Sequence, residues 1–170
     1  LVRTENGFIV VKYTEELVGT DEDGEEVWED GMSIVEVSTD LNTVKTLLTF
    51  DQEDVDALDG DIEVLSADKD GNIAILAPID LTGDGNAVDV IVTVDKDGNA
   101  IGGTTAEELF GSGYKPTNEY DEAPLFVDNL TLVNPNTKKL VRLTPELTEI
   151  DNYPLADGEM IYDAVLLNDD

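Results

Sequence analysis

The strongest structural signal in the chain is Ile62-Glu-Val-Leu-Ser-Ala-Asp-Lys-Asp-Gly-Asn-Ile-Ala-Ile-Leu-Ala77. Two short runs of mainly apolar residues, 62–66 and 73–77, flank the polar pentapeptide at 68–72. An Asp-Gly step favours positive φ, so this pentapeptide predicts a β-hairpin with a type I′ turn. The same five residues recur at 95–99, directly after an apolar run at 88–94. We interpret the two copies as shared hairpin chemistry rather than as a duplicated unit.

The rest of the chain is dominated by the same short, strand-sized patterns. We expect further strands at residues 8–13, 32–37, 43–50, 125–133, 139–143 and 160–167. About eight to ten short strands separated by turn signals predict a mainly β fold, rather than alternating strands and helices. The sequence therefore predicts an antiparallel β-sandwich or barrel with one or two short helices, as a single β-rich domain over residues 1–170.

Helical signals are few. Residues 105–108, Thr-Ala-Glu-Glu, form a capping-box pattern, and Gly111 can end the helix that follows it. Asp51 can cap a short helix over residues 51–58. Between the elements, long loops are expected at 111–124 and 144–159. Loops of this length on a rigid scaffold are where contacts with partners concentrate.

The composition excludes several classes of site. Hydrophobic residues make up 41% of the 170 residues, as in a globular domain, and the chain contains neither Cys nor His. Disulfides, thiolate zinc sites and His-activated nucleophiles are thereby excluded. The formal net charge of −31 repels nucleic acids and anionic lipid surfaces. In addition, no segment approaches the ~20 apolar residues of a membrane span. From the charge we expect no nucleic acid as a partner, and from the charge and the missing span we expect no membrane.

Residues 80–89, Asp-Leu-Thr-Gly-Asp-Gly-Asn-Ala-Val-Asp, form the first candidate binding site. Oxygen ligands at alternate positions, with a glycine for the sharp turn, can wrap a hard cation such as Ca²⁺. The candidate ligands are Asp80, Thr82, Asp84, Asn86 and Asp89. The segment resembles the Asp-rich calcium loops of secreted repeat proteins, including those of FG-GAP and dockerin type, and the resemblance implies calcium as the cofactor. It departs from the EF-hand pattern, because Ile91 occupies the twelfth position where a Glu belongs. The alternative is a glycine-rich turn leading into the strand at 88–94.

The same question arises for the two Asp-Gly turns. Asp68 with Asp70, and Asp95 with Asp97, could also chelate a metal ion. The hairpin turns explain these carboxylates without one.

No distinctive catalytic arrangement stands out in this sequence. Carboxylate pairs suffice for glycoside hydrolysis, but among 40 acidic residues no pair stands out by its context. The aromatic side chains that line sugar clefts are scarce, with one Trp and five Tyr, and no phosphate-binding loop is present. We predict that the protein is not an enzyme, with a carboxylate-based hydrolase as the third alternative.

The segment from Tyr13 to Trp28 predicts a second kind of hairpin. A strand ends at Val18, the chain turns at Asp23-Gly24, and a second strand returns through Val27 and Trp28. The order of its Tyr, paired Glu, Val-Gly-Thr, Asp-Gly and closing Val-aromatic resembles a hairpin of bacteriophage tail and appendage proteins. The resemblance implies a virion component. The acids at 21–22 and 25–26 depart from that pattern, since such hairpins often carry apolar or basic residues there.

A local cluster of positive charge occurs at Lys138, Lys139 and Arg142. It could dock on an acidic patch of a neighbouring copy in a head-to-tail contact. Alternatively, the cluster lies on a solvent-facing strand edge, where Lys discourages unwanted pairing.

These observations predict a non-enzymatic structural module on an exterior surface, first of all a capsid decoration or appendage of a virus particle. Its partners would be its own copies, in a homo-oligomer, or other shell and surface proteins. The residues expected to contact partners are Tyr114, Tyr120, Leu125 and Phe126. The alternative is a secreted or cell-envelope module that uses calcium at residues 80–89 for adhesion or glycan binding.

Overall fold

The computed structural model describes residues 2–4, 6–58, 60–83, 85–111, 125–127, 129–134 and 139–157. Within these residues the fold is mainly β, with antiparallel sheets and two short helices, and the predicted fold class is confirmed. The strand predicted at 160–167 and the loop segment 112–124 lie outside the described residues.

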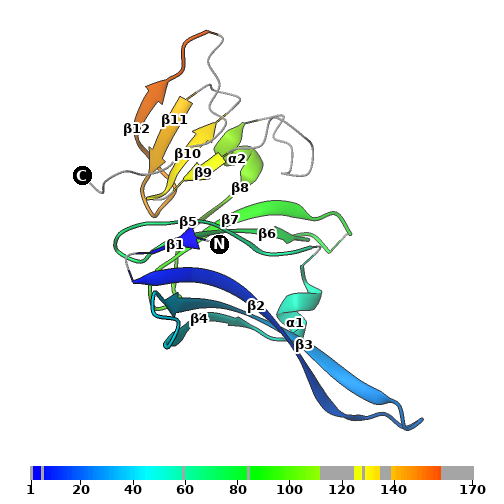
Figure 1. Ribbon diagram of the computed structural model, residues 1–170. Helices are drawn as coiled ribbons and strands as arrows, with labels where there is room; N and C mark the ends of the chain where they lie inside the picture. Colours follow the sequence, from blue (N-terminus) through cyan, green and yellow to red (C-terminus); the bar gives the residue numbers. More distant parts are fainter. Residues whose placement is uncertain are drawn as a thin grey trace.

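Three four-stranded sheets follow one another along the chain, and Figure 1 shows them arranged in a row. The N-terminal sheet has the order β1-β2-β3-β4, with β1 at Val2–Arg3, β2 at Gly7–Thr20, β3 at Glu26–Ser38 and β4 at Val44–Phe50. The middle sheet has the order β5-β6-β7-β8, with β5 at Glu63–Ala67, β6 at Ile73–Ile79, β7 at Val88–Val94 and β8 at Ala100–Thr105. The C-terminal sheet has the order β12-β11-β10-β9, with β9 at Leu125–Val127, β10 at Thr131–Asn134, β11 at Lys139–Leu143 and β12 at Glu149–Pro154.

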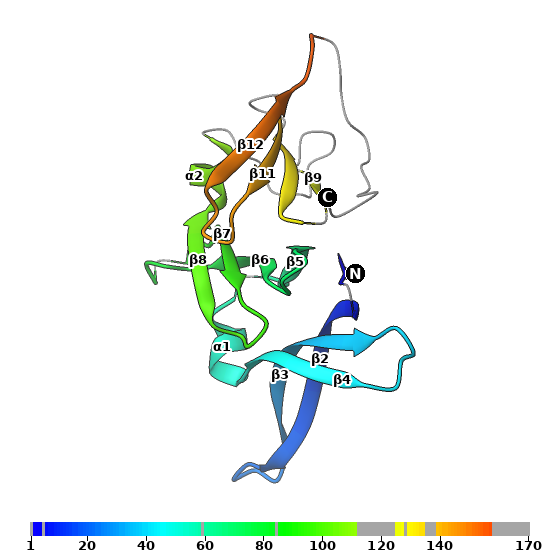
Figure 2. The same cartoon turned by 90° about the vertical axis from the view of Figure 1, so that its left-hand side faces the viewer.

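The middle sheet contributes to two cores, one on each of its faces. Alternate residues of β6 lie in different clusters: Ile73 and Ile75 pack with the N-terminal sheet, whereas Ala74 and Leu76 pack with the C-terminal sheet. A strand that is buried on both faces needs apolar residues at every position, which explains the continuous run at 73–77. The apolar signal of the sequence thus belongs to the central layer of the molecule, which Figure 2 shows from a second side.

The two helices begin as the sequence predicts. Helix α1, Gln52–Asp56, has Asp51 as its N-cap, and α2, Ala106–Phe110, has Thr105, with a reciprocal capping box at each. Phe110 of α2 is 2% exposed and packs in the cluster between the middle and C-terminal sheets. Helix α1 contains no buried residue and lies beside β3 and β4.

The Asp-Gly segments form hairpin turns, although not of the predicted type. At 68–72 and 95–99 only the glycine has positive φ (+85° for both Gly71 and Gly98), whereas a type I′ turn needs two such residues. The N–H of each glycine donates to the C=O of the first Asp, at 3.2 and 3.0 Å, which describes a type I turn followed by a left-handed glycine. The prediction of type I′ turns was therefore wrong. Asp68 and Asp95 favour the type I form because each carboxylate accepts backbone N–H groups within its own turn.

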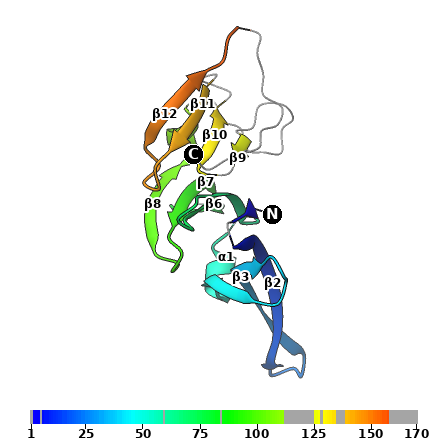
Figure 3. The same cartoon turned by 60° about the vertical axis from the view of Figure 1, so that its left-hand side comes forward.

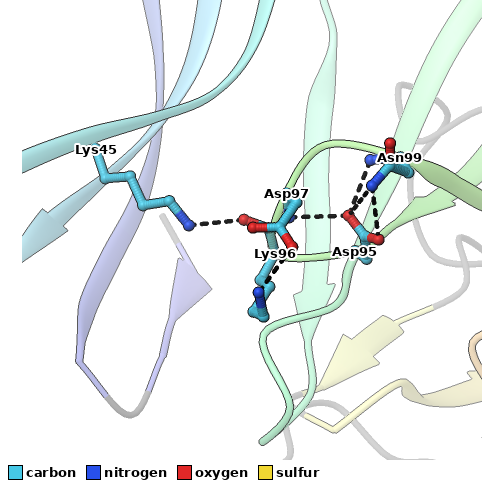
Figure 4. Close-up of polar contacts among 5 residues, drawn as sticks. All are labelled: Lys45, Asp95, Lys96, Asp97 and Asn99. Carbon is cyan, nitrogen blue, oxygen red and sulfur yellow. Dashed lines mark hydrogen bonds and ion pairs between the residues drawn. The ribbon is translucent and has the colours of Figure 1, made fainter.

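The turn at 95–99 also joins the middle sheet to the N-terminal sheet (Figure 4). Lys45 of β4 donates from Nζ to the backbone C=O of Lys96 at 2.7 Å, and Lys96 pairs with Asp97 at 2.7 Å. Hydrogen bonds from Asn99 lower the pKa of Asp95, and the bonding of the Asn99 side chain has a larger effect than the bond from its backbone N–H. The carboxylate of Asp95 thus holds the turn in a conformation that β4 can contact.

The strand predicted at 125–133 is two strands, β9 and β10, which pair antiparallel. The chain reverses at Asn129 and Leu130, both with positive φ. The middle sheet fixes this reversal, because Asn129 N–H donates to the C=O of Ala67 at 2.7 Å and Leu130 N–H donates to Oγ of Ser66 at 3.1 Å. A long-range pair of hydrogen bonds therefore overrides the local strand pattern.

The loop predicted at 144–159 contains the six-residue strand β12. Every residue of β12 is exposed, so burial of apolar side chains does not explain why the strand forms. The strand forms because it pairs with β11. Strand β11 consequently has neighbours on both sides, and the predicted solvent-facing edge at Lys139 and Arg142 is wrong. Lys138 lies outside the described residues.

Candidate functional site

The most prominent surface feature is the outer half of the β2–β3 hairpin, which projects away from the three sheets in Figures 1 and 3. Strand β4 pairs with β3 only as far as Met32, opposite Phe50, whereas β2 and β3 continue to pair out to Thr20 and Glu26. Residues 14–31 therefore form a two-stranded extension, which we call the arm. The prediction of a hairpin with its turn at Asp23-Gly24 is confirmed, with Leu17 opposite Trp28.

Two contacts attach the base of the arm to the body. The Tyr13 hydroxyl donates to Oδ1 of Asp61 at 3.1 Å, and the N–H of Asp30 donates to Oε1 of Gln52 in α1. Partial burial, together with the hydrogen bond to Asp61 and the charge of that carboxylate, raises the pKa of Tyr13. Beyond these contacts the strands of the arm are exposed on both faces.

The arm exposes large apolar side chains. Trp28 is 53% exposed and Leu17 46%, and the neighbouring Val18 and Val27 are also exposed. A register shift between Leu17 and Gly19 leaves Val18 as an extra residue in β2, as in a β-bulge. Sequence reasoning recognised the hairpin but missed these side chains as candidate contacts. The signal that could have found them is the bulky apolar content of a segment dense in carboxylates.

The predicted calcium loop at 80–89 is held by its first residue. Oδ1 of Asp80 accepts from the N–H groups of Thr82 at 3.0 Å and Gly83 at 2.7 Å, and Oδ2 accepts from the N–H of Gly85 at 2.7 Å. Both glycines have positive φ, as a tight turn requires. These bonds fold the segment into a tight turn that leads into β7.

Of the other predicted ligands, Thr82 contacts Asp80, because its hydroxyl donates to Oδ1 of Asp80 at 3.3 Å. Asn86 lies exposed ahead of β7, Asp89 is half-buried within β7 opposite Pro78, and Asp84 lies outside the described residues. Among the described residues no group of three or more acidic side chains is placed to hold a metal ion. Calcium binding therefore stays a prediction.

The predicted partner contacts are not tested by the structure. Tyr114 and Tyr120 lie outside the described residues. Leu125 and Phe126 belong to β9, where their backbones pair with Val133 and Leu132 of β10. Their role in binding stays a prediction.

Comparison with known proteins adds no further constraint, since no family model, curated protein or solved structure matches the chain. Neither helix in the described part of the chain is long and apolar enough to cross a membrane.

Proposed function

We propose that this protein is a non-enzymatic structural module that joins an assembly on an exterior surface, with a virus particle, as a capsid decoration or appendage, as the first setting. The observation that carries the proposal is the arm. An isolated two-stranded hairpin is marginally stable in water, and contiguous exposed apolar side chains mark interaction surfaces. The exposed Leu17–Trp28 pair on a projecting hairpin is therefore best explained by a protein partner.

Two sequence features support the exterior setting. The segment 13–28 resembles a hairpin of bacteriophage tail and appendage proteins. The net charge of −31 makes the folded chain self-repulsive, and the salt of an external medium screens that repulsion.

Immunogold electron microscopy of intact virus particles and cells from the source tests this function. We expect gold on the outside of the particles, and label confined to the cell interior would overturn the proposal. Gold on the cell envelope alone would replace the virion setting by the calcium-dependent adhesion or glycan-binding alternative. Antibody pre-absorbed with the purified protein is the control.

A variant without the arm adds a functional readout to the microscopy. When Asn-Gly replaces residues 15–30, every buried residue of the described chain is retained. This variant should fold with a Tm near that of the full chain but should not be incorporated into particles. Normal incorporation would remove the arm from the assembly contact.

A further inference from the structure

One face of the arm combines apolar side chains with carboxylates. Residues that alternate along a strand, or lie directly opposite across an antiparallel pair, share a face. By this register Leu17 and Trp28 share a face with Glu15 and Asp30. We call this the Trp28 face. It continues the face of β2 and β3 on which Met32 is buried in the core, so the packing surface of the sheet extends past the body.

Like charges lie directly opposite each other on both faces of the arm. Glu15 pairs with Asp30 on the Trp28 face, and Glu16 pairs with Glu29 on the opposite face. Directly opposed like charges destabilise a strand pair. Residues 15–30 hold nine carboxylates and no Lys or Arg, and the one ion pair in the described part of the chain, Lys96–Asp97, lies elsewhere. A cationic partner would relieve the repulsion at the same time as it covers the apolar pair.

We propose that the Trp28 face docks on a partner protein that presents an apolar strip edged by Lys or Arg side chains. This inference deepens the assembly function proposed above and rests on it. Charge complementarity indicates which kind of partner binds. The arm presents carboxylates beside an apolar centre, and protein interfaces pair opposite charges around an apolar centre, so the partner is expected to be basic.

A second copy of this chain fits less well. Docking one arm on another would bring two sets of nine carboxylates together. The basic residues of β11 do not form one surface, since Lys139 and Arg142 are three positions apart in a strand and lie on opposite faces, with Asp151 opposite Arg142. The partner is therefore expected to be a different, basic protein.

The test uses a synthetic ten-residue peptide of alternating Val and Lys as the probe, and the fluorescence of Trp28 as the readout. Trp28 is the only tryptophan of the chain, so its emission reports on the arm alone. We expect saturable binding with a shift of the emission to shorter wavelength. A Ser-Lys peptide should bind about tenfold more weakly, because it lacks the apolar side chains, and a Val-Glu peptide should not bind.

Matched variants separate the Trp28 face from the overall charge. Glu15→Lys/Asp30→Lys and Glu16→Lys/Glu29→Lys change the net charge equally, on opposite faces of the arm. The first double substitution should weaken binding of the Val-Lys peptide at least tenfold, and the second about threefold or less. All four residues are exposed, and circular dichroism would verify that both variants fold.

A second pair of variants tests the apolar contribution. Leu17→Ser should weaken binding about tenfold, whereas Leu81→Ser, at a site 62% exposed in the loop before β7, should leave it unchanged. Equal loss from both charge variants, or no effect of Leu17→Ser, would overturn the proposal. So would a concentration-dependent dimer in sedimentation experiments that Leu17→Ser abolishes, because it would assign the Trp28 face to a second copy.

The peptide assay does not depend on where the protein resides. Gold on particles combined with no selective peptide binding would refute the basic partner and leave the assembly function standing. Selective binding without gold on any exterior surface would refute the assembly function itself.

Discussion

The shared middle sheet predicts that the chain unfolds as one cooperative unit. Ile73 and Ile91 are both fully buried in this sheet, but Ile73 packs towards the N-terminal sheet and Ile91 towards the C-terminal sheet. Replacing either by Ala removes three carbons, worth about 2.4 kcal/mol of transfer free energy, and leaves a cavity that adds to this loss. We therefore expect each substitution to lower the free energy of unfolding by about 3 kcal/mol and Tm by roughly 6–12 °C.

Hydrogen–deuterium exchange measured by mass spectrometry locates the effect. In a single cooperative unit the slowest amides exchange only through global unfolding. A loss of about 3 kcal/mol in the free energy of unfolding therefore accelerates their exchange roughly 100-fold in every sheet. Ile91→Ala should thus accelerate peptides of β3 as strongly as peptides of β11, although Ile91 does not pack on β3. The exposed Val44→Ala in β4 is the control and should change stability by less than about 0.5 kcal/mol. Acceleration confined to the C-terminal sheet would show that the sheets unfold separately, against a single domain.

Three further predictions concern backbone contacts and titration. Gly102→Ala should lower Tm by several degrees, because its Cβ would lie 2.9 Å from backbone of the turn before β12, whereas Gly103→Ala, whose nearest contact is 3.8 Å, should be tolerated; thermal melts compare the two. Partial burial and the hydrogen bond to Asp61 favour the neutral hydroxyl of Tyr13 in the folded state and so raise its pKa. Their contribution to the free energy of unfolding is therefore present below pH 10 and lost as the pH rises through the pKa of the folded state. Urea unfolding at pH 8 and pH 11 should therefore show a smaller alkaline loss in Tyr13→Phe. Hydrogen bonds, the strongest of them from the Ser38 hydroxyl, lower the pKa of Asp40 to about 2. The contribution of this carboxylate to the free energy of unfolding is therefore complete above about pH 4 and disappears as the pH falls through 2. An NMR titration with a midpoint near 4 would contradict this.

The local elements could be predicted because neighbouring residues specify them. Asp51 and Thr105 cap the two helices with their own side chains, and the Asp-Gly turns are held by bonds between residues at most five apart. The turn at 38–43 shows the limit of this reasoning. Leu41 adopts φ of +61° there, in the left-handed region that the glycines of the Asp-Gly turns also occupy, although the sequence has no glycine in this turn.

The candidate site depended on a different kind of information. The Asp-Gly turn within residues 13–28 predicted a hairpin, but it did not predict that β4 would stop at Phe50 and leave the hairpin without a third strand. For residues 80–89 the pattern of oxygen-bearing side chains suggested a cation. The structure adds that backbone N–H groups donate to both oxygens of Asp80, which fixes the turn locally, and calcium binding stays a prediction.

The sequence by itself determined the strand-forming segments, the hairpin turns and the caps, because these depend on backbone preferences and hydrogen bonds over a few residues. Tertiary structure alone decided that β6 is buried on both faces, that Leu130 reverses the chain and that β12 forms as an exposed strand. It also decided that Trp28 remains in solvent. Each of these outcomes depends on partners supplied by distant parts of the chain, and a linear pattern does not record where those partners begin or end.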